Sequence, residues 1–408
     1  MHLFVRRCVV PLVLAPALFG QARLSLADAV SQALAENPRL AVAAARVNVA
    51  AGLREQAGLG PNPRLIVQLE NTRIWGNPSF SYPQETASYA FMAQTLETGG
   101  KRDRRVDLAA ENIRSSELEM QLARRQIASR VSAAYWVAVG AARVVDLLQA
   151  EVTSFDRVVQ YHRDRFVEGA APEVDLLRIE VERDRLAGLV KTAEQDADRT
   201  RIALFQEMGK REFPPVACAD TLEPARPVAS VALNEVLDRR IEMTIAREAV
   251  RQAHANLRLQ QANAKPDPDL HVGYERIGGF NTLYVASQIP LPLRNRNQGG
   301  IEAALAEIRA AESSVAATEA AIRAEIESAA RDYDSRRKLL AETLRPMLDR
   351  ADEVYRIVDA AYQETGGDLL RLLDAERTRI ETELMYARAL AELQQSAVAL
   401  ETAQGGLP

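Results

Sequence analysis

A seven-residue repeat of apolar side chains is the longest regular pattern in the chain. Over residues 127–166, apolar residues recur every seven positions in two rows that lie three or four residues apart. This heptad pattern is typical of a helix that packs along its length against other helices. Read as one helix, Lys101–Val167 would extend for roughly 100 Å at 1.5 Å per residue. We therefore expect partner helices along its whole length.

The same period returns in the second half of the chain. Apolar, aromatic or small residues stand seven positions apart at Ile326, Tyr333, Leu340, Met347, Val354 and Ala361. Pro346 lies within this run. Because the pattern continues beyond it, we expect the proline to bend the helix rather than to end it.

Four short segments alternate apolar and polar residues, as β-strands with one apolar face do. Their apolar positions are Leu65, Val67 and Leu69; Tyr89, Phe91 and Ala93; Leu270, Val272 and Tyr274; and Leu283 and Val285 with Ser287. Such strands fit a lipid-facing barrel, and they also fit a soluble sheet packed on a core. Four strands cannot close a barrel alone, and open edges are not viable in lipid. If the strands span a membrane, several chains must contribute to one barrel.

The chain carries this set of elements twice. The segment Glu55–Glu70 parallels Gln260–Glu275, and MAQTLETGGKRDRR parallels ASQIPLPLRNRNQGG. A Gly-containing turn followed by a leucine pair occurs in FVEGAAPEVDLL from Phe166, and 196 residues later in YQETGGDLLRLL from Tyr362. Each half therefore predicts the order helix, strand, strand, very long helix, turn, helix.

The predicted domain organisation follows from this duplication. Residues 1–22 combine the basic MHLFVRR, the apolar CVVPLVLAPALFG and a small-residue cleavage site, which indicates an export signal rather than an ordinary buried segment. We expect a first repeat at 23–212, a linker rich in Pro and Ala at 213–230, and a second repeat at 231–408. Removal of the signal would leave Cys218 as a lone cysteine, which excludes an intrachain disulfide.

Composition and charge exclude several classes of function. The formal charge is −5, aromatics make up 5% of the chain and no domain is strongly basic, so we expect no nucleic-acid partner. No nucleotide-binding loop, HExxH or CxxC pair occurs, so we expect neither an enzyme nor a cofactor. The histidines His162, His254 and His271 lie far apart in sequence, and a shared metal site is not expected. After the signal, the best apolar run, Val131–Ala142, is too short for a membrane helix.

Together these features resemble the TolC-type outer-membrane efflux channels over nearly the whole mature chain. The opening LSLADAVSQALAENPRL and the ending YARALAELQQSAVALETAQG are similar to that family's first and last helices. The resemblance implies a mainly α fold with a small β part and a homotrimer. Four strands from each chain would form one twelve-stranded barrel in the outer-membrane lipid. The helices would continue it as a coiled-coil tunnel in the periplasm that ends in hairpin tips, two from each chain.

Within that family, three stretches resemble the cobalt–zinc–cadmium branch of heavy-metal efflux proteins. They are QTLETGGKRDRR, IPLPLRNRNQGG and LRPMLDRADEVYRIVDAAYQETGGDLLRLLDAERTRI. The second has Arg294 where the branch usually has an aromatic residue. The resemblance implies a passive conduit for divalent cations, supplied by a periplasmic adaptor protein and an inner-membrane pump of the proton-driven RND type. A drug-efflux or type I protein-secretion channel is the alternative within the class.

A periplasmic coiled-coil adaptor or scaffold is the alternative from another class. An adaptor would have one long hairpin flanked by many short strands, whereas this chain predicts two hairpins and four strands. The pattern therefore favours the channel over the adaptor.

Four residues near the two turns match the gate and the periplasmic mouth of the resembling channels. The resemblance implies a contact between Asp175 and Tyr362, and a three-fold ring of Asp374 carboxylates at the mouth. Arg371 stands one helical turn from Asp374 and could neutralise part of that field. The alternative is that these are ordinary solvated charges on helix surfaces.

The turns themselves contain small residues that permit a reversal of direction. Gly169, Gly366 and Gly367 tolerate a positive φ, and Ala170 follows the first of them. The resemblance implies that these tips dock against helical hairpins of the adaptor, because small residues allow close contact.

Overall fold

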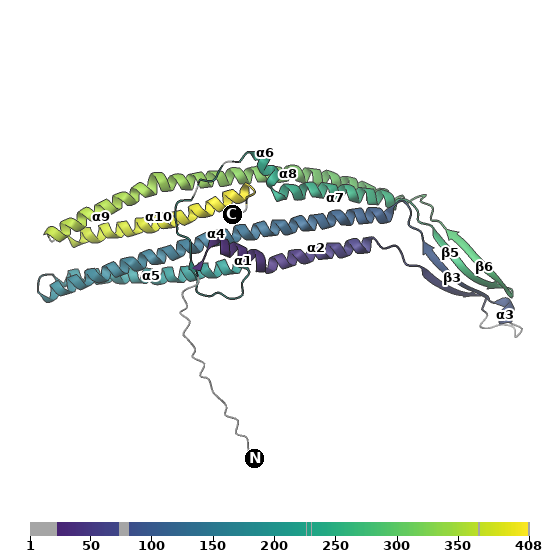
Figure 1. Cartoon of the computed structure of the whole chain (residues 1–408), viewed down its shortest axis with the longest axis horizontal. Helices are drawn as coiled ribbons and strands as arrows, with labels where there is room; N and C mark the ends of the chain where they lie inside the picture. The colour runs from purple at the N-terminus through teal and green to yellow at the C-terminus, as the bar shows by residue number, and fades with distance from the viewer. Residues whose placement is uncertain (1–22, 73–80, 226, 230, 366–367, 407–408) are drawn as a thin grey trace, which may run out of the picture.

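The molecule is an elongated stack of helices with a β-sheet at one end (Figure 1). The computed structural model describes residues 23–72, 81–225, 227–229, 231–365 and 368–406. The expected signal peptide at 1–22 lies outside the described residues. The sheet extends from one end of the helical body, and two helical hairpins form the opposite end (Figure 1).

The first half of the chain supplies one hairpin and two strands of the sheet. Its elements are β1 (Arg23–Leu24), α1 (Leu26–Glu36), α2 (Pro38–Ala57), β2 (Arg64–Glu70), α3 (Tyr82–Glu85), β3 (Ala87–Thr95), α4 (Lys101–Val167) and α5 (Glu173–Met208). The expected single helix at Lys101–Val167 is confirmed with both of its ends. Asn37 separates the two opening helices, since its backbone is extended and its side chain caps α2 at Arg39 N.

The second half repeats this order. Its elements are β4 (Ala217–Cys218), α6 (Leu233–Arg239), α7 (Ile241–Asn263), β5 (Asp269–Ile277), β6 (Phe280–Gln288), α8 (Gln298–Lys338), the π-helical segment η1 (Leu339–Leu344), α9 (Arg345–Thr365) and α10 (Leu369–Ala403). The linker region between α5 and α6 contains β4, which pairs in parallel with β1 at Leu24↔Cys218. No pattern in the sequence predicted this small two-stranded sheet.

The four longer strands form one antiparallel sheet in the order β2-β3-β5-β6. The strand β3 pairs with β5, so the two halves of the chain meet in the middle of the sheet. The edges of the sheet are therefore β2 and β6, one from each half. All four expected strands are confirmed, and each extends beyond the segment in which the alternation is visible.

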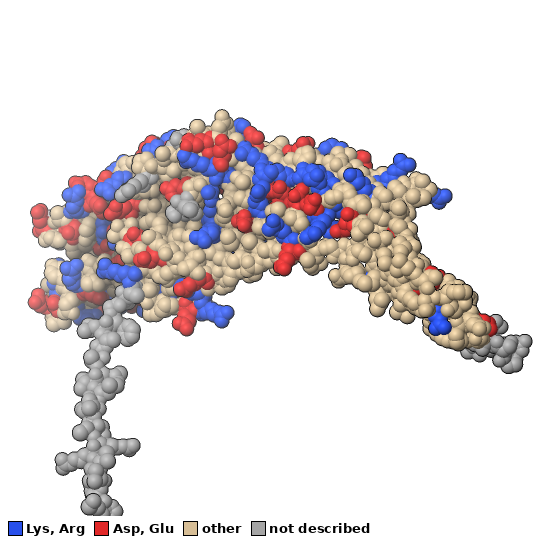
Figure 2. All heavy atoms as spheres, turned by 45° about the vertical axis from the view of Figure 1, so that its right-hand side comes forward, with Lys and Arg blue, Asp and Glu red and all other residues tan. Residues whose placement is uncertain are grey.

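One face of the sheet is apolar and exposed. Cross-strand partners share a face, and the register pairs Leu65 with Met92, Met92 with Val272, and Val272 with Val285. All four of these side chains are exposed. Figure 2 shows charged residues crowded over the helical body and few on the visible surface of the sheet. We call this apolar side, which also carries Val67, Leu69 and Leu283, the outer face.

The opposite face carries the aromatic residues of β3, which corrects the expected orientation of that strand. Tyr89, Phe91 and Ala93 do not share a face with Leu65, because Leu65 pairs with Met92. They lie on the second side, where the Phe91 ring is 4.9 Å from the ring of Tyr284. The outer face of β3 instead carries Ser88, Ala90 and Met92.

A glycine makes room for the aromatic cluster on this second face. Gly273 lies opposite Phe91 in the β3–β5 pair. A Cβ atom at Gly273 would come closer than 3.0 Å to the Ala90 carbonyl oxygen and to Phe91 Cα. The Phe91 ring also lies 5.4 Å from the His271 ring. Glycine is therefore required at this position by close backbone approach.

The helical body is assembled around α4, which packs against α1, α2, α5, α7 and α10. The expected heptad rows on this helix are confirmed in their central part. Ile127, Val131, Leu148 and Phe155 are almost completely buried. A stretch of α4 is long and apolar enough to cross a membrane by length and composition alone, but half of it is buried inside the chain. Its apolar residues serve the packing of helix on helix.

The second long helix continues past Pro346, as expected. The segment Leu339–Leu344 adopts π-helical geometry directly before α9 begins at Arg345. The run α8–η1–α9 bends along its course (Figure 1). A proline removes one backbone donor, and a wider turn before it accommodates this loss.

Within the single chain, the expected seam is buried before the π-helical segment and exposed after it. Tyr333 and Leu340 are buried as expected, but Val354 is 51% exposed and Ala361 is exposed. A π turn spreads more residues over one turn than an α turn and so changes the helical phase. Beyond the segment the buried position is Ala351.

Candidate functional site

The turn between α4 and α5 forms the first hairpin tip. The Ala170 amide donates to the Arg165 carbonyl over 2.7 Å, and the Gly169 amide donates to the Phe166 carbonyl over 2.9 Å. Gly169 has φ +74. These two bonds and a left-handed glycine make a Schellman motif that ends α4. The expected role of Gly169 in reversing the chain is confirmed, and Gly169 and Ala170 are exposed at the tip.

The second tip joins α9 to α10. Gly366 and Gly367, which we expected in its turn, lie outside the described residues. The first described residue after them is Asp368, whose side chain accepts a hydrogen bond from the Leu370 amide over 3.0 Å. This N-cap starts α10.

A hydrogen bond between the two hairpins lies close to the tips. The Tyr362 hydroxyl, near the end of α9, is 3.0 Å from Nε2 of His162 on α4. His162 is only 2% exposed, and its Nδ1 atom has no hydrogen-bond partner in the described part of the chain. Burial lowers the pKa of His162, and the nearby Arg165 lowers it further, so the neutral ring is favoured.

Asp175 lies close to this pair. Burial raises the pKa of Tyr362, and the charge of Asp175 adds to that increase. Within one chain, the Tyr362 hydroxyl forms its hydrogen bond with His162. Among the described residues, no hydrogen bond joins Tyr362 to Asp175. The direct contact between Asp175 and Tyr362 therefore remains a prediction. Sequence reasoning placed His162 on the packed seam but did not pair it with Tyr362.

Asp374 and Arg371 lie in a groove between α9 and α10. Both side chains are exposed and line a cavity of roughly 440 Å³ with Met347, Val354 and Val358. Arg371 Nε lies 3.9 Å from a carboxylate oxygen of Asp368. Arg371 therefore pairs with Asp368 rather than with Asp374. The expected neutralisation of Asp374 by Arg371 is not seen in the single chain.

A buried charge cluster links α4, α9 and α10 a few turns from the tips. Arg379 on α10 donates to Glu151 on α4 over 2.7 Å, and its guanidinium lies 5.0 Å from the centre of the Tyr355 ring on α9. Glu383 lies 3.5 Å from the same guanidinium. Glu376 is 4% exposed in this cluster.

The charges around Glu376 are not balanced. Burial raises the pKa of Glu376 to about 7, and the neighbouring carboxylate of Glu151 adds to the increase. The positive charge of Arg379 lowers the pKa of Glu376, but this guanidinium also pairs with Glu151 and Glu383. The heptad pattern could not reveal this cluster, because its members stand in three different helices.

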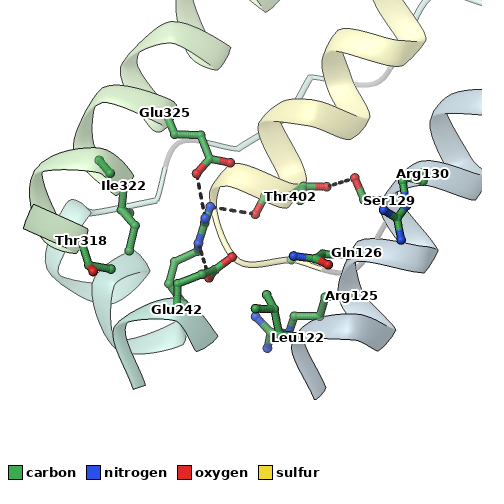
Figure 3. Close-up of a pocket in the computed structure, with 13 residues that line it drawn as sticks. Leu122, Arg125, Gln126, Ser129, Arg130, Glu242, Thr318, Ile322, Glu325 and Thr402 are labelled. Atoms are coloured by element: carbon green, nitrogen blue, oxygen red, sulfur yellow. Dashed lines mark hydrogen bonds and ion pairs between the residues drawn. The ribbon is translucent and has the colours of Figure 1, made fainter. Parts of the chain in front are cut away.

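A second arginine centre joins three helices of the second half of the chain, in the middle of the body (Figure 3). Arg240 donates to Glu242 over 2.9 Å and to Glu325 over 2.7 Å. It also donates to the Ala403 carbonyl over 2.9 Å. Since the last carbonyls of a helix lack partners within the helix, Arg240 closes the end of α10 and ties it to α7 and α8. The cavity beside it measures roughly 510 Å³.

The comparison with known protein families identifies the fold described above. The family model for outer membrane efflux proteins matches residues 29–210. This match covers most of the first half of the chain. The predicted TolC-like fold is confirmed by the similarity to solved outer-membrane channels.

Two curated relatives match most of this chain. It is 22% identical to the cobalt-zinc-cadmium resistance protein CzcC of Cupriavidus metallidurans, over 94% of this chain and 90% of that protein. It is 24% identical to the nickel-cobalt-cadmium resistance protein NccC of Alcaligenes xylosoxydans xylosoxydans, over 70% of this chain and 64% of that protein. The solved structure of CusC matches with a TM-score of 0.75 at 16% identity, over 95% of this chain and 93% of that one.

Proposed function

We propose that three copies of this chain form the outer-membrane conduit of a tripartite efflux system for divalent heavy-metal cations. The observation that carries the cargo assignment is the similarity to CzcC over 94% of this chain, since CzcC is a cobalt-zinc-cadmium resistance protein. The chain is passive, so the choice of cargo belongs to an inner-membrane pump, for which we propose the proton-driven RND type.

The single chain leaves surfaces that support assembly with further copies. The strands β2 and β6 are the two ends of the sheet, so within the described residues each has one edge without a partner strand. In lipid, unpaired backbone groups are very costly, and closure of the sheet into a barrel removes them. Three chains with four strands each would give one twelve-stranded barrel.

The helices carry matching apolar stripes that need partners. Val42 and Val49 on α2 are exposed and stand seven residues apart, as are Val174 and Val181 on α5. On the other side of the molecule, α9 exposes Val354 and Ile357. Heptad stripes of this kind are covered by neighbouring helices in a coiled coil. A ring of copies would bring α5 of one chain against α9 of the next.

Metal tolerance tests the cargo. A strain that lacks the gene should become sensitive to zinc, cobalt and cadmium, and the wild-type gene should restore growth and lower the intracellular metal content. The tolerance of the same strain to lipophilic drugs is measured in parallel, as the comparison for its metal tolerance. A strain that loses drug tolerance while its metal content stays normal would favour the alternative, a drug-efflux channel.

We also propose that the hairpin tips dock against helical hairpins of a periplasmic adaptor. Gly169 → Val should weaken docking, because valine is strained at φ +74 and adds bulk at the exposed tip. Gly188 → Val on α5 is the control, since no heavy atom lies within 4 Å of a Cβ atom at Gly188. The measurement is cross-linking to the adaptor in cells with equal amounts of assembled channel. Equal cross-linking by the two variants would count against docking at this tip.

A further inference from the structure

The connection between β6 and α8 exposes three large apolar side chains in a row. Ile289, Leu291 and Leu293 are 55%, 72% and 75% exposed. Pro290 and Pro292 stand between them. Exposed apolar side chains grouped in this way mark an interaction surface.

This row continues the outer face of the sheet. Leu283 and Val285 stand on that face of β6, which ends at Gln288. The three apolar residues of the connection follow at the same alternate spacing. The strand itself ends at Gln288, and the Leu293 amide donates to the Leu291 carbonyl over 2.8 Å, which makes a tight turn centred on Pro292. The exposed apolar side chains therefore continue in sequence from the outer face of β6 into the turn that leads to α8.

Two arginines follow the apolar row directly. Arg294 and Arg296 are exposed, and neither forms an ion pair within the residues that the structure describes. Arg296 Nε donates to the Pro292 carbonyl over 3.2 Å, and the Arg294 carbonyl accepts from Gln298 Nε2 over 3.1 Å. These bonds hold the backbone of the connection while leaving most of both guanidinium groups free. A guanidinium group binds phosphate oxygens well because it presents a planar set of donors.

The equivalent connection in the first half is built differently. Between β3 and α4, the Lys101 side chain contacts Asp267 over 2.6 Å, and the Thr98 amide donates to the same carboxylate over 2.7 Å. Arg105 likewise pairs with Glu97. Lys101 and Arg105 of this first junction are therefore paired with acids within the chain, whereas Arg102 is exposed. The second junction differs in that both of its arginines are exposed and directly follow an apolar row.

We propose that the connection from Ile289 to Arg296 is a binding site for anionic phospholipid in the periplasmic leaflet of the outer membrane. Leu291 and Leu293 enter the acyl region, and Arg294 and Arg296 bind the headgroup phosphate at the water boundary. Juxtamembrane arginines are attracted to anionic lipid surfaces in this way. The site rests on the outer-membrane location of the chain and not on its cargo.

Lipid retention by the purified full-length assembly tests this site. The protein is reconstituted in nanodiscs that contain phosphatidylglycerol and phosphatidylcholine, and the lipids that stay bound are counted by native mass spectrometry. Wild-type protein should retain phosphatidylglycerol preferentially. The preference should fall about fivefold for each arginine removed in R294Q and R296Q, which corresponds to about 1 kcal/mol per charge. Leu291 → Ser with Leu293 → Ser should lower the retention of both lipids.

The control is Arg388 → Gln, which removes an exposed arginine of α10 in the helical body. It should retain phosphatidylglycerol as the wild type does. An unchanged preference in the R294Q/R296Q double variant overturns the proposal. The double variant could also assemble poorly while the assembled particles keep the wild-type lipid preference. This result would assign the connection to a contact between copies and would also overturn the proposal. The lipid readout needs no metal, so its failure is distinguishable from a failure of the cargo assignment.

Discussion

The hydroxyl of Tyr362 lies 3.0 Å from Nε2 of His162, and this bond joins the second hairpin of the chain to the first. The two rings are 5.9 Å apart and inclined by 31°. Tyr362 also packs on the apolar cluster that includes Phe155 and Ile179. The tips of one chain are therefore a single packed unit near the mouth of the tunnel. A wider mouth that requires the hairpins to separate must break this bond.

Tyr362 → Phe should favour the wider mouth. The substitution keeps the ring in the cluster and removes only the hydrogen bond, which typically contributes about 0.5–1.5 kcal/mol. We expect a larger mean single-channel conductance in planar lipid bilayers. The control is Tyr161 → Phe, which removes the hydroxyl of an exposed neighbouring tyrosine. Identical conductance in both variants would show that the His162–Tyr362 bond does not hold the mouth.

Glu376 should make the hairpin packing depend on pH. Its pKa is about 7 in the folded chain and near 4.5 when exposed. The folded state therefore binds this proton more tightly, and stability should fall as the pH rises from about 4.5 to about 7. The shift corresponds to a loss on the order of 3 kcal/mol if no other group compensates. Glu376 → Gln should remove most of this loss, as measured by urea unfolding of the purified protein at pH 5 and pH 8.

The matched control for this substitution is Glu381 → Gln on the same helix. Glu381 is exposed and pairs with Arg377 at the surface. Surface pairs contribute little to stability, so this variant should keep the pH dependence of the wild type. If Glu376 → Gln and Glu381 → Gln lose stability equally between pH 5 and pH 8, the buried carboxyl is not its source.

The parts of the fold that sequence patterns predicted are those that repeat over long distances. The helix Lys101–Val167 was predicted with both ends, because a heptad repeat over many turns leaves little freedom of interpretation. The four strands were recognised from the alternation of apolar and polar residues, which is typical of a strand with one apolar face. The duplication then fixed the order of elements in the second half.

The errors arose where a local pattern is ambiguous. Tyr89, Phe91 and Ala93 are apolar enough to be read as the outer face of β3, and only the pairing with β2 shows that they face the other side. Val354 follows the expected heptad but is exposed in the single chain, after a π-helical segment that changes the phase of the helix. No local pattern marks such a segment, so the shift could not be read from the sequence.

The site was predicted less completely than the fold. The resemblance pointed to Tyr362, but its partner His162 stands 200 residues away and depends on how the two hairpins pack. The cluster of Glu151, Glu376 and Arg379 likewise forms only when three helices come together. A charged residue in a heptad helix gives no local sign that it is buried among other helices.

Gly273 should be required for assembly of the sheet. Gly273 → Ala places a Cβ atom closer than 3.0 Å to backbone atoms of Ala90 and Phe91, so β3 and β5 cannot keep their spacing. Overpacking of this kind costs about 1–3 kcal/mol or more. We expect a loss of assembled outer-membrane protein in native gels. Gly299 → Ala is the control, because no heavy atom lies within 4 Å of that position. Normal assembly of the Gly273 variant would contradict the observed register.

Asp374 and Arg371 should act on ion selectivity in opposite directions if they line the mouth of an assembled channel. Both side chains are exposed in the same groove, and Arg371 is not paired with Asp374. Asp374 → Asn removes a negative charge from each copy, so the permeability ratio of potassium to chloride in planar bilayers should fall. Arg371 → Gln removes a positive charge from each copy, so the ratio should rise.

The pair of substitutions separates a mouth ring from solvated surface charges. Exposed charges are screened beyond about 8–10 Å at ordinary ionic strength, so only charges near the ion path change selectivity strongly. Arg356 → Gln on α9 is a suitable control, since Arg356 is exposed and pairs with Glu353 on its own helix. We expect the effects of Asp374 → Asn and Arg371 → Gln to grow as the salt concentration is lowered. If all three variants keep the wild-type ratio at low salt, Asp374 does not form a ring at the mouth.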